Sequence, residues 1–336
     1  MIRSLLLLVA TTTTLLSGCG NLAQIAYDTG LRAETSRAQL AGHTLTLPAR
    51  TDDAAVDWHY LATKGFHSNR DTDQRPVVLL VHGFGADSSN WLRMIIELKH
   101  DFLFVVPDLP GHGASSGDTD TDYRLEAQAR RLLSLMSALD VEAFHVAGNS
   151  MGGAISLEMA RLAPTRVRTL GLVNAAGLTL QTPEFLALIS DGGNPLIPRD
   201  VADFRETLKW AMAEPPWLPD FFVRVMGEKK AANAARMDKV WADLGEDPAM
   251  ARGEDDGAVL ASINNPALVI WGDQDRLLSN ENADRFIEYL PNSRKIMLPG
   301  IGHAPMVEAP RDTAMALGAF WLQQEGLAEE SMAERQ

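Results

Sequence analysis

Ser150 lies in the pattern of this sequence that most clearly indicates chemistry. The pattern is Gly148-Asn149-Ser150-Met151-Gly152, and it separates a strand-like apolar run from a segment of helical periodicity. A sharp turn from a strand into a helix exposes the serine hydroxyl above the sheet, and flanking glycines let the backbone pass without Cβ clashes. The helix start also brings a positive dipole end close to developing negative charge. We therefore predict that Ser150 is a nucleophile.

A serine nucleophile requires a general base, and His303 is the predicted base. When the serine lies on a strand-to-helix turn, the acid and then the base follow it along the chain. His303 follows Ser150 in the loop Gly300-Ile301-Gly302-His303, after a strand-like run. Histidines outside any such pattern are interpreted as structural or surface residues: His43, His59, His67, His100, His112 and His145.

Two aspartates compete for the role of the acid that orients His303. Asp273 and Asp275 follow the buried run that ends at Trp271. The loop after the preceding strand, residues 174–177, has no carboxylate, which removes the other position available for the acid. The residues on their own leave the choice between Asp273 and Asp275 open.

Short apolar runs alternate with longer segments of helical periodicity, which is the pattern of a parallel sheet flanked by helices. The predicted strands are Val77–Val81, Leu103–Val106, Phe144–Ala147, Thr169–Val173, Leu268–Trp271 and Arg294–Leu298. The predicted helices are Ser89–Leu98, Tyr123–Leu139, Met151–Leu162, Asn282–Leu290 and Asp312–Gln323.

Residues 178–262 interrupt this alternation. They contain no convincing buried strand, and Gly- and Pro-containing breakers at 192–195, 214–216 and 246–248 separate helical fragments. A structureless loop of this length is improbable in a compact domain, so the segment is predicted to be a helical cap. Most of its aromatic and aliphatic residues are expected to pack with one another, and a few to face a site at the carboxyl edge of the sheet.

The N-terminus carries a predicted lipoprotein signal. A basic start and an apolar stretch, Leu5–Leu16, precede Ser17-Gly18-Cys19, which with Leu16 resembles the bacterial lipobox. In that motif the chain is cut before the cysteine and the cysteine is acylated, so residues 1–18 would be removed and Cys19 would anchor the protein. A plain secretory signal and an uncleaved helix are the alternatives, but the stretch is shorter than the roughly 20 residues of a membrane span. Gly20 after the cysteine favours the outer membrane of a bacterial envelope, on its periplasmic or surface side.

The same patterns divide the chain. Residues 19–50 are predicted to be a spacer or lead-in helix, residues 51–177 with 263–325 the α/β core, and residues 326–336 a polar tail. The formal net charge of −14, with no Lys/Arg-rich run, argues against nucleic acid as a partner.

Four motifs together resemble the α/β-hydrolase superfamily from about residue 76 to residue 321, outside the predicted cap. They are His-Gly-Phe-Gly at 82–85, Gly-Asn-Ser-Met-Gly-Gly at 148–153, Trp-Gly-Asp-Gln-Asp at 271–275 and Gly-Ile-Gly-His-Ala-Pro at 300–305. Within the superfamily, the chain is similar to the monoacylglycerol lipase branch and its membrane-associated bacterial lipase and phospholipase relatives. The resemblance implies an α/β-hydrolase fold, a mostly parallel central sheet flanked by helices with the helical cap inserted after the sixth strand.

The resemblance also implies roles for single residues. In the family's Trp-Gly-x-x-Asp pattern the second aspartate is catalytic, which favours Asp275 over Asp273. The backbone N–H groups of Phe84 and Met151 are expected to form the oxyanion hole, because this fold takes one donor from the loop after its third strand and one from the residue after the nucleophile. No metal or other cofactor is implied.

We expect a membrane-anchored serine hydrolase of carboxylic esters, a lipase or esterase that acts on acylglycerol- or phospholipid-type substrates and so degrades lipids. The anchor and the apolar cap both suit a substrate taken from a membrane. C–C bond hydrolases and cofactor-free haloperoxidases share the triad and are the alternatives. A non-catalytic binding protein on this fold is less favoured, because no triad residue is missing.

Overall fold

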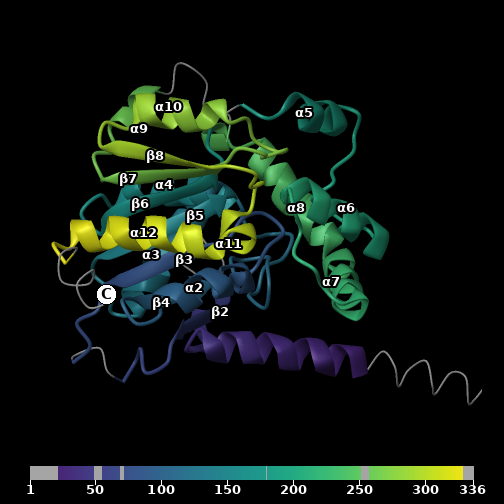
Figure 1. The fold of residues 1–336 in the computed structure, drawn as a ribbon, viewed down its shortest axis with the longest axis horizontal. Helices are drawn as coiled ribbons and strands as arrows, with labels where there is room; N and C mark the ends of the chain where they lie inside the picture. Colours follow the sequence, from purple (N-terminus) through teal and green to yellow (C-terminus); the bar gives the residue numbers. More distant parts are fainter. Residues whose placement is uncertain (1–21, 49–54, 69–71, 179, 251–256, 328–336) are drawn as a thin grey trace, which may run out of the picture.

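The computed structural model describes residues 22–48, 55–68, 72–178, 180–250 and 257–327. Within these ranges the chain forms an eight-stranded sheet in the order β1-β2-β4-β3-β5-β6-β7-β8 (Figure 1). The pairs β1/β2 and β2/β4 are antiparallel and the other neighbours are parallel. The predicted fold class is thereby confirmed. The strands are β1 (Leu40–Leu47), β2 (Val56–Thr63), β3 (Val77–Val81), β4 (Leu103–Pro107), β5 (Phe144–Ser150), β6 (Val167–Ala175), β7 (Ala267–Gly272) and β8 (Ser293–Leu298).

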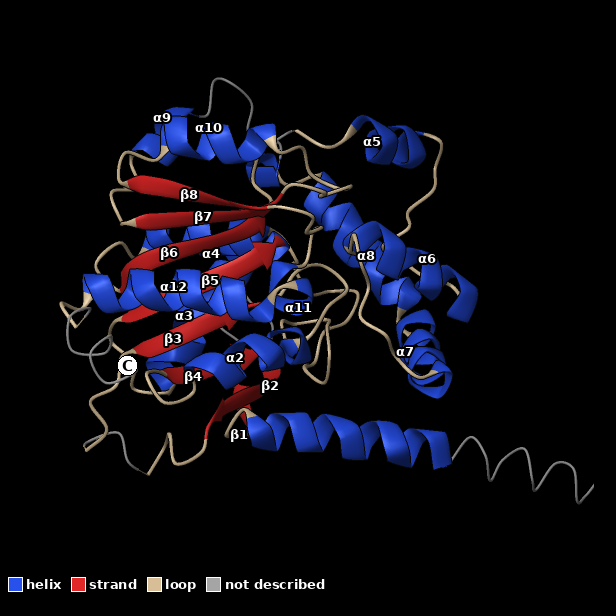
Figure 2. Cartoon of the chain, in the orientation of Figure 1, coloured by secondary structure: helices blue, strands red, loops and turns tan. Residues whose placement is uncertain are grey.

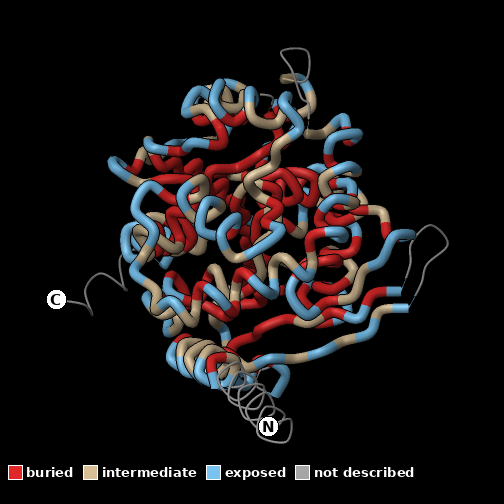
Figure 3. Tube along the Cα trace, turned by 90° about the vertical axis from the view of Figure 1, so that its right-hand side faces the viewer, coloured by how far each residue is buried: buried red, intermediate tan, exposed pale blue. Residues whose placement is uncertain are grey.

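The central strands are buried on both faces. In β3, Val77 and Leu79 pack into the core on one side of the sheet, whereas Val78 and Leu80 pack into the core on the other. This is expected because successive side chains of a strand point to opposite faces. The tube in Figure 3 accordingly shows buried strands between helices that are exposed on their outer sides.

Helices cover both faces of the sheet (Figure 2). On one face lie α3 (Leu125–Ala138), α4 (Met151–Leu162) and α10 (Glu281–Tyr289). On the other lie α2 (Leu92–Leu98), α11 (Pro305–Glu308) and α12 (Pro310–Gln324), and the 3-10 turn η1 (Ser88–Trp91) precedes α2. The helices predicted from periodicity are therefore present, with ends shifted by a few residues.

The prediction for residues 19–50 is wrong in part. Residues 22–37 are helical, but residues 40–47 form β1, which pairs with β2 from Leu40↔Thr63 to Leu47↔Val56. Burial alternates along β1 because it is an edge strand with one face toward solvent. Such a half-exposed strand lacks the continuous apolar run by which the central strands were identified. The predicted signal at 1–18 and the anchor Cys19 lie outside the described residues, as does most of the predicted tail.

Between β6 and β7 the chain leaves the sheet and forms helices beyond its carboxyl edge, toward which the strand arrows point (Figure 1). We call α5 to α8 the cap. Its helices are α5 (Pro183–Ser190), α6 (Val201–Ala211), α7 (Asp220–Ala232) and α8 (Ala234–Gly245), after which η2 (Pro248–Met250) and α9 (Gly257–Ala261) lead back to β7. In the described part of the chain, no helix combines the length and apolarity needed to cross a membrane.

Candidate active site

Ser150 lies on the sharp turn between β5 and α4. Its φ is 54° and its ψ is −121°, in a region that residues other than glycine rarely adopt. A Cβ on Gly148 would lie 2.1 Å from the carbonyl oxygen of Gly152, and a Cβ on Gly152 would lie 2.2 Å from that of Val81. The turn therefore requires both glycines of the motif, and it presents Ser150 at the carboxyl edge of the sheet.

His303 and Asp275 form a hydrogen-bonded pair in the loops that follow β8 and β7. His303 Nδ1 lies 2.7 Å from Asp275 Oδ2, and both residues are buried. Because Asp275 engages Nδ1, the opposite ring nitrogen, Nε2, is the one that can serve a reacting group. Asp273 has a different partner, since its carboxylate accepts the backbone N–H of Gly300 at 2.7 Å. Of the two candidate acids, Asp275 is the one that the fold brings to His303.

Two asparagines that the sequence analysis did not single out hold this pair in place. Asn174, at the end of β6, donates to Asp275 Oδ2 at 2.7 Å and accepts the Gly272 N–H at 3.1 Å. Asn149 donates to the backbone carbonyl of His303 at 3.0 Å. Both asparagines are buried polar residues at the carboxyl ends of apolar strands, and that placement is the signal by which they could have been found.

The turn after β3 brings Phe84, one of the two predicted oxyanion donors, close to Ser150. A Cβ on Gly83 would lie 3.1 Å from the Ser150 Cβ, so the backbone just before Phe84 passes directly beside the turn that carries Ser150. His82 holds this turn, because its Nδ1 donates to the Gly83 carbonyl at 2.8 Å and its Nε2 accepts a backbone N–H from the loop after β4 at 2.9 Å. Burial lowers the pKa of His82, which favours the neutral ring that this pair of bonds requires. Met151 is the first residue of α4.

Glu308, at the end of α11, connects the His303 loop with the cap. Its Oε1 accepts the Gly302 N–H at 3.0 Å, and its Oε2 accepts the Ala213 N–H at 2.8 Å. Burial raises the pKa of the Glu308 carboxyl. The backbone N–H of His303 also donates to the carbonyl of Ala211, the last residue of α6, at 3.0 Å. The loop that carries His303 is therefore attached to the cap at two points.

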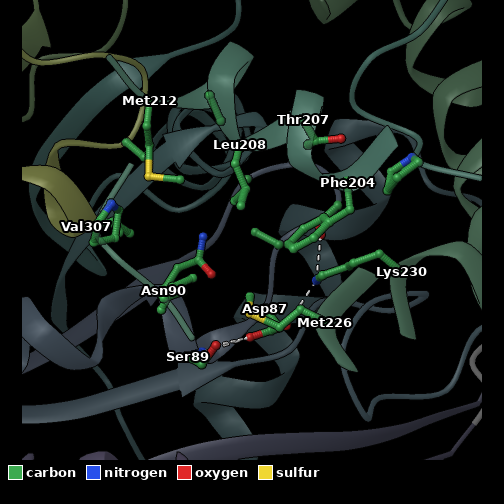
Figure 4. Close-up of a pocket in the computed structure, with 18 of the residues that line it drawn as sticks. Asp87, Ser89, Asn90, Phe204, Thr207, Leu208, Met212, Met226, Lys230 and Val307 are labelled. Atoms are coloured by element: carbon green, nitrogen blue, oxygen red, sulfur yellow. Dashed lines mark hydrogen bonds and ion pairs between the residues drawn. The ribbon is translucent and has the colours of Figure 1, made fainter. Parts of the chain in front are cut away.

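A cavity of about 550 Å³ lies between the sheet edge and the cap, and Ser150, His303 and Phe84 contribute to its wall. Much of the cap side is apolar, as Figure 4 shows for Phe204, Leu208, Met212 and Met226. The residues opposite the cap are more polar and include Asp87, Ser89 and Asn90, and Lys230 of the cap helix α7 extends to Asp87. The cavity can hold an apolar group against Ser150.

The N-terminal helix, residues 22–37, also reaches this cavity. Tyr27 and Leu31 contribute to the wall. The Tyr27 ring lies 5.1 Å from the ring of Phe222 on α7, and the Lys229 ammonium lies 4.3 Å from the Tyr27 ring centre. Burial raises the pKa of Tyr27 to about 12. A segment that the sequence presented as a spacer is thus part of the pocket wall.

Comparisons with known proteins agree with this architecture. Residues 76–310 match a family model described as the alpha/beta hydrolase fold. The chain is 33% identical over 292 residues to Lipase 3 of Moraxella sp. (strain TA144), covering 86% of this chain and 87% of that protein. It is 35% identical over 245 residues to Lipase 1 of Psychrobacter immobilis, covering 72% and 76%. The crystal structure of a membrane phospholipase A, described as a novel bacterial virulence factor, superposes with a TM-score of 0.84 at 29% identity, covering 97% of this chain and 99% of that one.

Proposed function

The chain belongs to the alpha/beta hydrolase fold family and is a carboxylic ester hydrolase, and we propose that it cleaves lipid esters through an acyl-enzyme on Ser150. The observation that carries this proposal is the Asp275–His303 pair, because His303 of this pair lines the same cavity as Ser150. Along the chain the three residues follow one another as Ser150, Asp275 and His303, which is the order of nucleophile, acid and base that this fold uses.

In the proposed mechanism, His303 Nε2 takes the proton of the Ser150 hydroxyl while Oγ attacks the ester carbonyl carbon. The carbonyl oxygen becomes an oxyanion that accepts hydrogen bonds from the backbone N–H groups of Phe84 and Met151. Asp275 keeps the proton of His303 on Nδ1 and stabilises the imidazolium. His303 then gives its proton to the departing alcohol, the acyl group stays on Ser150, and a water molecule repeats the sequence to release the acid.

We propose that the acyl chain of an acylglycerol or a phospholipid occupies the apolar side of the cavity. Phe204, Leu208 and Met226 of the cap would contact it. The two bacterial lipases and the membrane phospholipase A support a lipid substrate, because each is named for that chemistry. The polar residues opposite would then lie near the glycerol or head-group part.

The bacterial relatives and the membrane phospholipase fit a protein of the bacterial envelope. We propose further that acylation of Cys19 attaches the mature chain to the membrane, with the outer membrane favoured. Cys19→Ser should move the protein to the soluble fraction after cell lysis. Continued membrane association of that variant would contradict the anchor and leave the esterase proposal intact.

The decisive test of the chemistry uses a series of p-nitrophenyl esters of increasing chain length and a fluorophosphonate probe. Ser150→Ala should lose at least about 10⁴-fold in kcat/KM and should not be labelled. The control is Ser190→Ala, which removes an exposed serine of α5. A Ser150→Ala protein that still hydrolyses the esters and still reacts with the probe would refute the proposal.

A further inference from the structure

Lys230 of α7 reaches from the cap into the turn that carries Phe84. Its ammonium donates to the backbone carbonyl of Gly85 at 2.7 Å and lies 3.1 Å from Asp87 Oδ2 (Figure 4). Lys230 lies in the last turn of α7, where the negative end of the helix dipole also favours a cation. A single charged side chain of the cap therefore holds Gly85 and Asp87, two residues of the turn that carries Phe84.

Asp87 extends this contact into the core. Its Oδ1 accepts the Ser89 N–H at 3.1 Å and so caps the 3-10 turn that precedes α2. Burial opposes the charged form of Asp87, but the Lys230 ammonium and the Ser89 hydrogen bond outweigh it and hold the pKa of the Asp87 carboxyl below its usual range. The pair is thus an ion pair in which each partner is also hydrogen-bonded to backbone.

His82 holds the start of this turn at the Gly83 carbonyl, but the part of the turn after Gly83 has little support of its own. Gly85 has a φ of +67°, and the hydrogen bond that closes the turn, from the Ala86 N–H to the Gly83 carbonyl, is long at 3.3 Å. The Phe84 side chain is held by the cap as well, since its ring lies 5.3 Å from the ring of Trp241 on α8. The Gly83 carbonyl, which shares a peptide unit with the Phe84 N–H, is held by His82 of the core, whereas Gly85 and the Phe84 ring are held by the cap. The direction of the Phe84 N–H therefore depends on the cap as well as on the core.

We propose that Lys230 is a positioning residue, whose ammonium holds the Gly85 carbonyl and Asp87 so that the Phe84 N–H points at the oxyanion. This inference rests on the proposed function, because it assigns Lys230 a role in the same oxyanion hole. A misaligned oxyanion donor reduces the stabilisation of the transition state but leaves substrate binding in the ground state nearly unchanged. A Lys230 that only formed part of the pocket wall would instead change substrate binding.

The experiment compares Lys230→Met with Lys229→Met in the full chain on p-nitrophenyl butyrate. Lys229 is a matched control, because it is the adjacent lysine of α7 and forms an ion pair of its own, 3.5 Å from Asp28 on the N-terminal helix. Lys230→Met should lower kcat about 10- to 100-fold with KM within about threefold, because removing one oxyanion donor outright costs about 10²- to 10³-fold. Lys229→Met should leave both constants within about twofold.

A second readout reports on the oxyanion directly. An alkyl trifluoromethyl ketone forms a tetrahedral adduct with the serine whose oxygen occupies the oxyanion hole, whereas the corresponding secondary alcohol cannot. Lys230→Met should lower the affinity for the ketone by about the same factor as it lowers kcat. It should leave the affinity for the alcohol unchanged. Lys230→Arg, which keeps a cationic donor at this position, should recover part of both losses.

Three results would overturn the inference. One is an unchanged kcat in Lys230→Met, and another is a rise in KM that accounts for the whole loss. The third is an equal loss of affinity for the ketone and for the alcohol. If Ser150→Ala abolishes activity while Lys230→Met has no effect, only this inference fails; if Ser150→Ala stays active, the proposed function fails first.

Discussion

The sheet edge and the cap face each other across one cavity, but their helices differ in how many residues they bury. Helix α4, behind Ser150, spans 12 residues, and ten of them are buried, from Met151 to Ala160. Helix α6, on the cap side, spans 11 residues, and only Phe204 is buried. Helices with few buried residues open at lower free energy than helices inside a core. The cap is therefore the part of the site that can change shape.

The proposed catalytic groups are held by contacts within the well-buried region at the sheet edge. Asp275 accepts backbone N–H groups from Leu277 and Leu278 on Oδ1, and Asn174 and His303 on Oδ2. Each lone-pair direction of the carboxylate is engaged, so it has one orientation. The difference between the two regions suggests that the core sets the chemistry, with Lys230 as the proposed contribution of the cap, whereas the apolar wall of the cap sets the choice of substrate. Each prediction below tests that division, beginning with the largest expected effect.

Removing the charge of Asp275 should be the most damaging of these changes. Asp275→Asn keeps the shape but no longer holds the His303 proton on Nδ1, and we expect kcat to fall about 10⁴-fold. The control is Asp273→Asn, in which the amide oxygen can still accept the Gly300 N–H, and kcat should stay within about threefold. The measurement is p-nitrophenyl butyrate hydrolysis, and equal losses in both variants would show that Asp275 has no special role.

A buried histidine of the core is expected to lower the stability of the folded protein in acid. Burial lowers the pKa of His145 in β5 to about 4, against about 6.5 in an unfolded chain. The unfolded chain therefore binds the proton first, so this contribution is complete above pH 6.5 and is lost as the pH falls toward 4. It amounts to about 3 kcal/mol at most.

Urea unfolding between pH 7 and 4 tests this assignment. His145→Asn, whose amide can keep the contact with Thr169, should start from a lower stability and show a shallower decline than the wild type. Parallel declines in the two proteins would mean that His145 is not the group that titrates.

Filling the cap side of the cavity should change the substrate range and spare the chemistry. Leu208→Trp places a larger side chain in the wall, so we expect kcat/KM for dodecanoate esters to fall about tenfold while acetate esters stay within about threefold. Leu186→Trp, on an exposed face of α5, should change neither. A proportional loss on all chain lengths would contradict the division between core and cap.

The smallest effect is expected at Trp217, which follows α6 at the rim of the cavity and is 84% exposed. Trp217→Ala should leave hydrolysis of water-soluble esters within about twofold. It should lower the activity on esters presented in lipid vesicles several-fold, because an exposed indole favours the membrane interface. Equal activity on vesicles would remove Trp217 from any contact with the lipid surface.

Local pattern in the sequence was sufficient for the central strands, the helices beside them and the turn at Ser150. Those features depend on periodicity and on glycines that must lie within a few residues of one another. The motif order also limited the acid to two neighbours, Asp273 and Asp275. The resemblance to a family favoured Asp275, and the tertiary structure is what places that residue beside His303.

Other features arise only when distant segments meet. The edge strand β1 needed its pairing with β2 to be recognised, because its alternating pattern is weak by itself. Asn174 gains its role from Asp275, 101 positions later, and Lys230 from Gly85, 145 positions earlier. A hydrogen bond over such a separation leaves no periodicity in the sequence. At this site, local sequence determined which groups are present, and tertiary contacts decided how they are aimed.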